Sequence, residues 1–410
     1  MKEMRTQQCQ LSKIAYLVTD KIPMEDVPLT NYVTTDSLLP NKKGRCFAQN
    51  LPPQKCVLTH YKSGDVLVAN IRPYLKKIWL ADREGGASAD VLVFRARPGH
   101  SQGFIYASLL QDSFYDYAMK GKKGSKMPRG DKDQIMRYSI PKLSLAEEAC
   151  IGNMILSFCT KINVNRMIND NLEAMAKQLY DYWFVQFDFP NEEGKPYKSS
   201  GGAMVWNEKL KREIPSSFEV VNMGKLCDFR NGINYSKDET GNDYQIVNVR
   251  NISSSRILLD GEDFDVITVP TSKAGNYVLK PDDIIIARSG CPGSTRLLLS
   301  PANTLFCGFI ICCSPNDSRM RNYLVYCLKQ LEGTNATTSG GSILQNVSQD
   351  TLKGLHVIVP EKQIIDKFNK TIELIFARML NCLKESKALT KQRNELLPLL
   401  MNGQATVNSD

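Results

Sequence analysis

Two segments of the chain repeat the same order of sequence patterns about 218 residues apart. The segment GDVLVANIRPYLKKIWLADREGGASADVLVFRA (64–96) aligns with DDIIIARSGCPGSTRLLLSPANTLFCGFIICC (282–313), which places Ala69 opposite Ala287. It also places Asp65 opposite Asp283. Both segments follow the order strand, turn, strand, loop, strand. A repeat of this length predicts two domains with the same fold.

Further pairs of segments flank this repeat in the same order. The order and approximate spacing of the pairs are kept, and the first pair predicts a strand followed by a polar exit. The pairs are NYVTTDSLL (31–39) with YQIVNVRNI (244–252), GSKMPRGDKDQI (124–135) with GSILQNVSQDTL (341–352), and YSIP (138–141) with VIVP (357–360). Each half of the chain therefore predicts a mixed, mostly β globular domain that is followed by a proline and a long helix.

The stretch that follows the second domain carries a coiled-coil seam. A spacing of three and four residues runs from Ile365 to Leu400, and nine of its eleven positions are apolar or Cys. These positions are Ile365, Phe368, Ile372, Ile375, Met379, Cys382, Ser386, Leu389, Arg393, Leu396 and Leu400.

The stretch that follows the first domain predicts a matching helix. It begins with a capping-box pattern, Ser144 with Glu147. A similar seam continues to Tyr182, although its phase slips between Ile162 and Ile168. Each helix would have about 40 residues and would form a rod of roughly 60 Å. Two rods of equal length favour antiparallel pairing and a pseudo-twofold arrangement of the two domains.

The sequence therefore predicts an α+β fold: two mixed, mostly β globular domains joined by two long antiparallel coiled-coil helices, with a pseudo-twofold internal repeat. The expected division is a first domain over 1–143, a helix and linker over 144–205, a second domain over 206–359 and a final helix over 360–410. The polar stretch NEEGKPYKSSGG (191–202) is the expected linker. The alternative is that each helix is amphipathic and packs only on its own domain.

Basic residues are concentrated in the first domain. Residues 1–143 contain 23 Lys and Arg against 13 Asp and Glu, whereas residues 206–359 contain 16 of each. A local positive excess is typical of polyanion binding, although it also serves solubility.

Two clusters in the first domain are candidates for DNA contacts. A Gly-rich loop groups Lys132 with Lys122, Lys123, Lys126 and Arg129, and a strand turn groups Arg72, Tyr74, Lys76 and Lys77. Cations in a flexible loop can follow a phosphate backbone and release its counterions. The alternative is ordinary solvated surface charge.

Two clusters in the second domain are the corresponding candidates. The turn that aligns with Arg72–Lys77 contains Arg288, Ser289, Ser294 and Arg296, and a loop groups Arg230, Asn231, Asn234, Tyr235 and Lys237. Arg suits guanine edges, Asn suits adenine, and Ser contacts phosphate. The sequence predicts these loops as DNA-binding but does not assign individual base contacts.

The motifs of common DNA-modifying enzymes are missing. An adenine methyltransferase needs an Asn/Asp-Pro-Pro-Tyr/Phe tetrapeptide, and the nearest stretch, NLPPQ (50–54), does not supply it. The chain has no GxxxxGK[ST] phosphate loop and no G-x-S-x-G elbow, and Pro281-Asp282 is not followed by the Glu-x-Lys of a nuclease. The sequence therefore predicts a binding protein that is not an enzyme and uses no cofactor.

The cysteine and apolar patterns narrow the class further. The twelve cysteines form no CxxC pair and only three histidines are present, so no metal site is expected. Cys307, Cys312 and Cys313 lie in an apolar run and are expected to be reduced and buried. No apolar run reaches the length of a membrane helix and the N-terminus lacks a signal-peptide pattern, so a cytoplasmic protein is expected.

Three motifs resemble the DNA-specificity (S) subunits of type I restriction-modification systems. NLEAMAKQLYDYWFVQFDFPNEEGKPYKSSGGAMVWNEKLKREIPSSFE (171–219) is similar to the central conserved region of that family. GDVLVAN (64–70) together with GKLCDFRNGINYSKDETGNDYQIVNVRNI (224–252) resembles the cores of its target-recognition domains. LKESKALTKQRNELLPLLMNGQATV (383–407) resembles its C-terminal conserved helix.

The resemblance implies a non-catalytic subunit that reads a split DNA sequence. Two target-recognition domains would each read one half of the target, and the two helices would act as a spacer. The implied partners are double-stranded DNA, two methyltransferase subunits and, for cleavage, translocase-nuclease subunits. The alternatives are a stand-alone sequence-specific DNA-binding protein and a coiled-coil scaffold without a restriction role.

Surplus aromatic residues at the end of the first helix predict a partner interface. Tyr180, Trp183, Phe184 and Phe187 exceed the two positions in seven that a seam uses. Exposed aromatics at this point would anchor a methyltransferase subunit. The alternative is that they pack against the second recognition domain.

Overall fold

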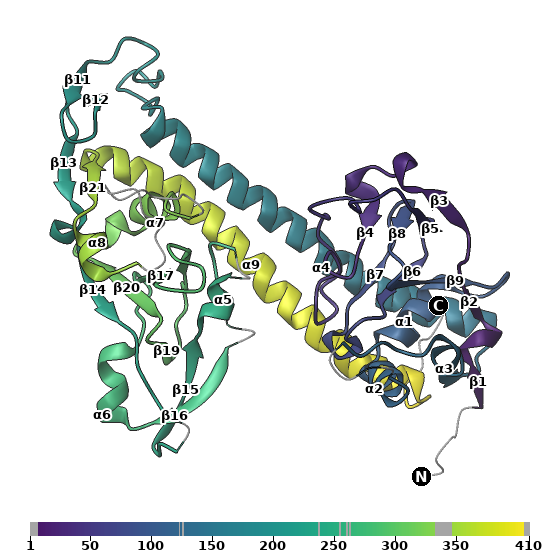
Figure 1. Ribbon diagram of the computed structural model, residues 1–410. Helices are drawn as coiled ribbons and strands as arrows, with labels where there is room; N and C mark the ends of the chain where they lie inside the picture. The colour runs from purple at the N-terminus through teal and green to yellow at the C-terminus, as the bar shows by residue number, and fades with distance from the viewer. Residues whose placement is uncertain are drawn as a thin grey trace. The chain divides into compact units, whose positions relative to one another are not determined.

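The computed structural model divides the chain into two compact units (Figure 1). Unit 1 comprises Met1–Asn163 and Ala388–Asp410, and unit 2 comprises Val164–Lys387. The structure describes residues 7–122, 124, 127–236, 238–253, 256–259, 261, 264–332 and 347–405. The two long helices are α4 (Leu145–Tyr180) and α9 (Lys362–Met401). Each lies partly in unit 1 and partly in unit 2.

A four-stranded antiparallel sheet forms the centre of unit 1. Its strand order is β2 (Ala15–Leu17), β9 (Val91–Ala96), β6 (Val66–Ala69) and β7 (Ile78–Leu80). The central strand β6 is buried along its whole length, as the apolar run VLVA predicts for a strand covered on both faces. The predicted strand, turn, strand, loop, strand order of this segment is confirmed.

Shorter elements cover this sheet. A second sheet has the order β3 (Lys21–Pro23), β5 (Val57–Tyr61), β8 (Gly85–Ala87) and β4 (Tyr32–Val33), and β1 (Gln8–Gln10) pairs with β10 (Ser139–Pro141). The short helices are α1 (Gln102–Leu110), α2 (Asp112–Lys120) and α3 (Lys132–Met136). Helix α1 is apolar and almost wholly buried, and its Phe104, Ile105 and Leu109 pack with the sheet in one core.

Unit 2 repeats the central sheet of unit 1. The order is β14 (Cys227–Asn231), β20 (Ile310–Pro315), β17 (Ile284–Ala287) and β18 (Thr295–Leu297), again antiparallel throughout. Cys312 and Cys313 on β20 are buried free thiols, as expected, and so is Cys307. Burial raises the pKa of the Cys307 thiol. The internal repeat that the sequence predicts is thus present in the strand topology.

The remaining elements of unit 2 follow a similar plan, with three strands in place of four in the second sheet and one added hairpin. A three-stranded sheet has the order β16 (Asp265–Val269), β15 (Asn242–Val247) and β19 (Thr304–Phe306), and β13 (Glu219–Asn222) pairs with β21 (His356–Val359). Helices α5 (Val249–Ser253), α6 (Thr271–Ala274), α7 (Arg321–Lys329) and α8 (Gln349–Lys353) surround the sheets. The addition is the hairpin of β11 (Met204–Asn207) and β12 (Arg212–Pro215).

The two long helices have the lengths that their seams predict. Helix α4 (Leu145–Tyr180) has 36 residues and α9 (Lys362–Met401) has 40. The predicted capping box is confirmed, because the Ser144 backbone N–H donates to Glu147 Oε2 at 2.8 Å and the Glu147 backbone N–H donates to Ser144 Oγ at 3.3 Å.

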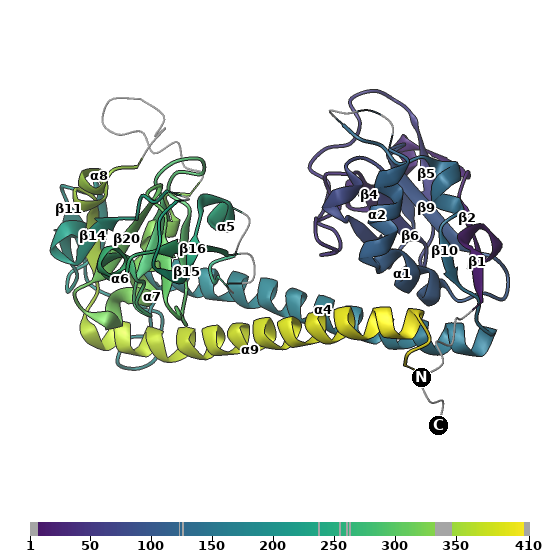
Figure 2. The same ribbon diagram turned by 90° about the horizontal axis from the view of Figure 1, so that it is seen from below.

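The helices lie side by side and antiparallel within each unit (Figure 2). In unit 2, the Asn165 side chain lies against Cys382 and Glu385, and Asn169 Nδ2 donates to the Met379 carbonyl at 3.3 Å. In unit 1, the core contains Ile151 and Ile155 of α4 together with Leu397, Leu400 and Met401 of α9. The α+β class with paired long helices is therefore confirmed. The four-segment domain division stays a prediction.

The aromatic residues at the end of α4 correct the expected partner interface. Tyr180, Trp183, Phe184 and Phe187 are all buried in the core of unit 2. The Phe184 ring lies 4.8 Å from the Tyr323 ring of α7 and 5.0 Å from the Phe368 ring of α9, centroid to centroid. The seam between two helices cannot bury so many rings. In unit 2, helix α7 packs against them as well. The expectation of exposed anchors was wrong, and packing on the second domain is what the structure has.

The predicted linker (191–202) is also folded more tightly than expected. Ser199 donates to both carboxylate oxygens of Asp188, from its backbone N–H at 2.7 Å and its hydroxyl at 2.6 Å. The Phe189 and Tyr197 rings stack with centroids 4.6 Å apart. The segment is therefore a compact turn attached to unit 2.

The described residues contain neither a candidate membrane-spanning helix nor a candidate cluster of metal ligands. No helix among them combines the length and the apolarity that crossing a membrane requires. No group of three or more His, Cys, Asp or Glu side chains in the same residues is arranged to hold a metal ion.

Candidate nucleic-acid interface

Two predicted clusters of unit 1 meet at one end of the central sheet. Strand β6 ends at Ala69, and the turn that follows it runs alongside the loop that begins at Met127. The Arg72 backbone N–H donates to the Pro128 carbonyl at 2.8 Å, and the Gly130 backbone N–H donates to the Asn70 carbonyl at 3.2 Å. Residues 56 to 60 positions apart in the sequence therefore share one surface.

The four basic and aromatic residues of the turn divide into two kinds. Arg72 and Tyr74 are exposed, and Arg72 has no side-chain partner among the residues that the structure describes. Lys76 Nζ lies 2.8 Å from Asp112, and Lys77 Nζ donates to the Thr35 carbonyl. Partial burial lowers the pKa of Lys77. Arg72 and Tyr74 are thus presented to solvent, whereas Lys76 and Lys77 hold the turn in place.

The basic loop is only partly described. Lys122 and Lys132 are exposed, and Arg129 Nε lies 3.1 Å from Asp90 Oδ1. Lys123 and Lys126 lie outside the described residues. Lys122, Lys132 and Arg72 are therefore the described cations of this surface whose charge is not committed to an ion pair within the same described residues.

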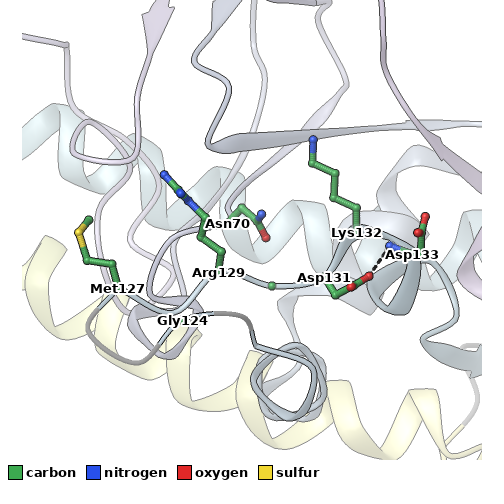
Figure 3. Close-up of a pocket in the computed structure, with 8 residues that line it drawn as sticks. Asn70, Gly124, Met127, Arg129, Asp131, Lys132 and Asp133 are labelled. Atoms are coloured by element: carbon green, nitrogen blue, oxygen red, sulfur yellow. Dashed lines mark hydrogen bonds between the residues drawn. The ribbon is translucent and has the colours of Figure 1, made fainter.

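A pocket opens where the turn and the loop meet (Figure 3). Its volume is about 550 Å³, and its walls are formed by Asn70, Gly124, Met127, Arg129, Gly130, Asp131, Lys132 and Asp133. Asn70 is only 7% exposed, and its Oδ1 has no hydrogen-bond partner in the described structure. The sequence analysis missed Asn70. The available signal was the repeat, because Ala69 opposite Ala287 places Asn70 opposite Arg288.

The corresponding end of the sheet in unit 2 gathers a second set. Arg288 follows the last residue of β17, and its backbone N–H donates to the Phe309 carbonyl at 2.9 Å. The loop after β14 reaches the same end, since the Gly308 backbone N–H donates to the Ile233 carbonyl at 2.9 Å. This places the predicted Asn234 and Tyr235 near Arg288. Phe309, which is 64% exposed, joins them and was not predicted.

Arg230 and Arg296 do not belong to this surface and correct the prediction. Arg230 Nη2 lies 2.6 Å from the buried Asp283 carboxylate and also donates to the Val278 carbonyl at 3.2 Å. Arg296 is 6% exposed and pairs with Glu332 at 2.5 Å. A cation that already has a carboxylate partner would leave that carboxylate unpaired if it turned to a phosphate or a base. Lys237 lies outside the described residues.

Sequence comparison matches part of the chain to a known family. The family described as Type I restriction modification DNA specificity domain matches residues 215–397. The MjaIX specificity subunit of Methanocaldococcus jannaschii is 22% identical over 86% of this chain and 80% of its own length. The HindI specificity subunit of Haemophilus influenzae is 23% identical over 96% of this chain and 98% of its own length.

The chain is thus similar to type I restriction-modification specificity subunits, and the family's DNA specificity domain matches residues 215–397.

Structure comparison supports the fold. The crystal structure of the S subunit from M. genitalium matches with a TM-score of 0.54, at 15% identity, over 100% of this chain and 98% of that one. At this identity the match speaks for the fold alone. The polar and aromatic side chains at the two sheet ends that have no partner among the described residues are the candidate nucleic-acid surfaces of this chain.

Proposed function

We propose that this specificity subunit reads a bipartite DNA target, one half with each unit, and directs methyltransferase and translocase-nuclease subunits to it. The observation that carries the proposal is the repeated sheet end. In each unit a central strand of the repeat, β6 or β17, leads directly into a side chain that can read a base, Asn70 in unit 1 and Arg288 in unit 2.

The proposal keeps the expected domain division and a non-catalytic role. Target-recognition domains would occupy 1–143 and 206–359, with the helical segments 144–205 and 360–410 between and after them. Methyl transfer would come from two partner methyltransferase subunits, because the chain lacks the catalytic tetrapeptide. Work on genomic DNA would place the protein in the cytoplasm.

Reconstitution tests the role directly. The purified chain alone should transfer no methyl groups from S-adenosylmethionine to DNA, and adding the methyltransferase subunits of the same system should produce adenine methylation at a split sequence. Single-molecule sequencing of the methylated DNA measures both the activity and the motif. Methyl transfer by the chain alone would refute the non-catalytic role.

The same experiment separates the alternatives. A stand-alone DNA-binding protein would select a sequence tightly and form no stable complex with the methyltransferase. A coiled-coil scaffold would bind no DNA even at low salt, whereas phosphate contacts give an affinity that falls steeply as salt is raised.

The proposed spacer role rests on the register of α4 against α9. Asn165 and Asn169 are buried in the helix pair of unit 2, at 1% and 2% exposure, and each has an Oδ1 atom without a partner in the described structure. Asn165 Nδ2 donates to Glu385 Oε2 at 2.8 Å. A buried polar residue in a seam fixes register at a cost in stability.

We therefore expect Asn165→Leu with Asn169→Leu to loosen the register while keeping or raising stability by about 1 kcal/mol, because two unpaired oxygens are removed. The motif selected by the reconstituted complex should then contain more than one spacer length. Val164→Leu, on the exposed side of α4, is the matched control and should leave one spacer length. A single unchanged spacer in the double variant would count against the spacer role.

A further inference from the structure

Asn70 and Arg288 occupy the same position in the two units. Each follows the alanine that ends the corresponding strand, Ala69 of β6 or Ala287 of β17. The Asn70 backbone N–H donates to the Asp90 carbonyl at 2.8 Å, just before β9 begins, and the Arg288 backbone N–H donates to the Phe309 carbonyl at 2.9 Å, just before β20 begins.

A second backbone hydrogen bond, made by the carbonyl, is also shared by the two residues. The Asn70 carbonyl accepts from Gly130 N–H at 3.2 Å, and the Arg288 carbonyl accepts from Val347 N–H at 3.0 Å. Gly130 and Val347 each stand shortly before a short helix, α3 or α8. Two backbone hydrogen bonds therefore hold one residue of each unit between a neighbouring strand and an incoming loop. The backbone is fixed in the same way while the side chain differs.

The Asn70 side chain has a polar atom without a hydrogen-bond partner among the described residues. Its Oδ1 is buried without a partner, although most buried polar atoms have one. A Cβ atom at position 130 would come within 2.8 Å of this oxygen, so glycine there leaves room for the amide. Asn70 lines the pocket together with Arg129 and Lys132, whose side chains lie on either side of it in Figure 3. Arg129 pairs with Asp90, whereas Lys132 has no ion pair within the described residues and would attract an anionic strand to this amide.

The Arg288 side chain is available to bind a ligand. It is exposed and makes no hydrogen bond or ion pair that the described residues of unit 2 supply. Arg230 and Arg296, by contrast, are held by Asp283 and Glu332. A guanidinium on a fixed backbone, with no competing carboxylate, can donate two parallel hydrogen bonds to one acceptor pair.

We propose that Asn70 and Arg288 are equivalent specificity-determining residues, each of which reads one base of its half-site: an adenine by Asn70 and a guanine by Arg288. This inference rests on the proposed bipartite reading. An amide matches the N6 donor and N7 acceptor of adenine, and a guanidinium matches O6 and N7 of guanine, all in the major groove. The fold supplies the position and the residue found there sets the base.

The test is the target motif of the full-length subunit reconstituted with its methyltransferase subunits. Duplexes with two randomised blocks are methylated and sequenced for the unaltered protein and for each variant. Asn70→Ala should lose the preference for one adenine in one half-site by roughly 5- to 150-fold and leave the other half-site unchanged. Arg288→Ala should lose one guanine in the other half-site by a similar factor.

Two further substitutions at position 70 distinguish a change of base preference from a loss of DNA binding caused by misfolding. Asn70→Asp preserves the side-chain volume and should move the preference at that base from adenine towards cytosine, whose N4 donates to a carboxylate. Asn70→Arg should move it towards guanine. Hydrogen exchange of each variant should match that of the unaltered protein, which shows that the fold is retained.

The repeat also supplies matched controls. Lys13 and Lys225 are exposed and close the short turns before β2 and β14, at the opposite end of each central sheet. Lys13→Ala and Lys225→Ala should leave the motif unchanged.

Three results would overturn the inference. Asn70→Ala and Arg288→Ala could leave both half-sites intact, weaken all sequences equally as phosphate contacts do, or alter the same half-site. Each would contradict equivalent base readers while leaving a split motif of the unaltered protein, and thus the proposed function, in place. Failure of the unaltered complex to select a split motif would refute both.

Discussion

Phe184→Ala lowers the free energy of unfolding of unit 2 by about 3–5 kcal/mol, the cost of truncating a buried phenylalanine. The ring fills the space between α4, α7 and α9, where it contacts the rings of Tyr323 and Phe368. Surrounding rings cannot close such a cavity without moving two helices. Hydrogen exchange measured by mass spectrometry should show faster exchange in α7 and β20, and peptides from unit 1 serve as the internal reference.

Tyr182→Ala is the control for Phe184→Ala. Tyr182 lies two residues away and is 38% exposed, so its truncation should change the stability of unit 2 by less than about 1 kcal/mol. A stable Phe184→Ala protein that had lost only its affinity for the methyltransferase would restore the interpretation of these aromatics as a partner surface.

Arg230→Ala should destabilise unit 2 by about 3 kcal/mol, because it leaves the Asp283 carboxylate buried without its counter-ion. The Asp283 side chain is 2% exposed and would retain only hydrogen bonds from the Lys280 backbone N–H at 2.9 Å and the Ser314 hydroxyl at 2.6 Å. Chemical denaturation followed by hydrogen exchange in β17 measures the loss.

Arg288→Ala is the matched comparison for Arg230→Ala. Both remove an arginine near the same sheet, but Arg288 is exposed and unpaired within the described part of unit 2. Its removal should leave stability unchanged and alter the DNA motif. Equal losses of stability in the two variants would contradict the separation of a structural arginine from a reading arginine.

Local and periodic features of the fold were predictable from the sequence. The seam from Ile365 to Leu400 predicted α9, and the Ser144 and Glu147 pair predicted the start of α4, because helix periodicity and capping depend on residues a few positions apart. The repeat predicted the shared order of the central strands for the same reason, since each half carries its own pattern of apolar runs.

The division of the basic residues into structural and exposed ones was not predictable in this way. Asp65 pairs with Arg95 on β9, whereas its repeat mate Asp283 pairs with Arg230 on β14. The ion pair is kept but a different strand supplies the arginine. Sequence alignment places Arg230 in a loop-like basic cluster, and only the pairing of β14 with β20 brings it to the buried carboxylate.

The sequence by itself determined that this protein has two copies of one mostly β domain and two long helices with seams. These properties follow from the offset of the internal repeat and from the spacing of apolar residues along the chain. The tertiary structure decided which of the candidate side chains remain without a partner among the described residues. It buried Phe184 and its neighbours against α7, committed Arg230 and Arg296 to carboxylates, and left Asn70 and Arg288 at the ends of β6 and β17. Burial and ion pairing depend on residues far apart in the chain, and their partners are fixed only when the strands and helices pack.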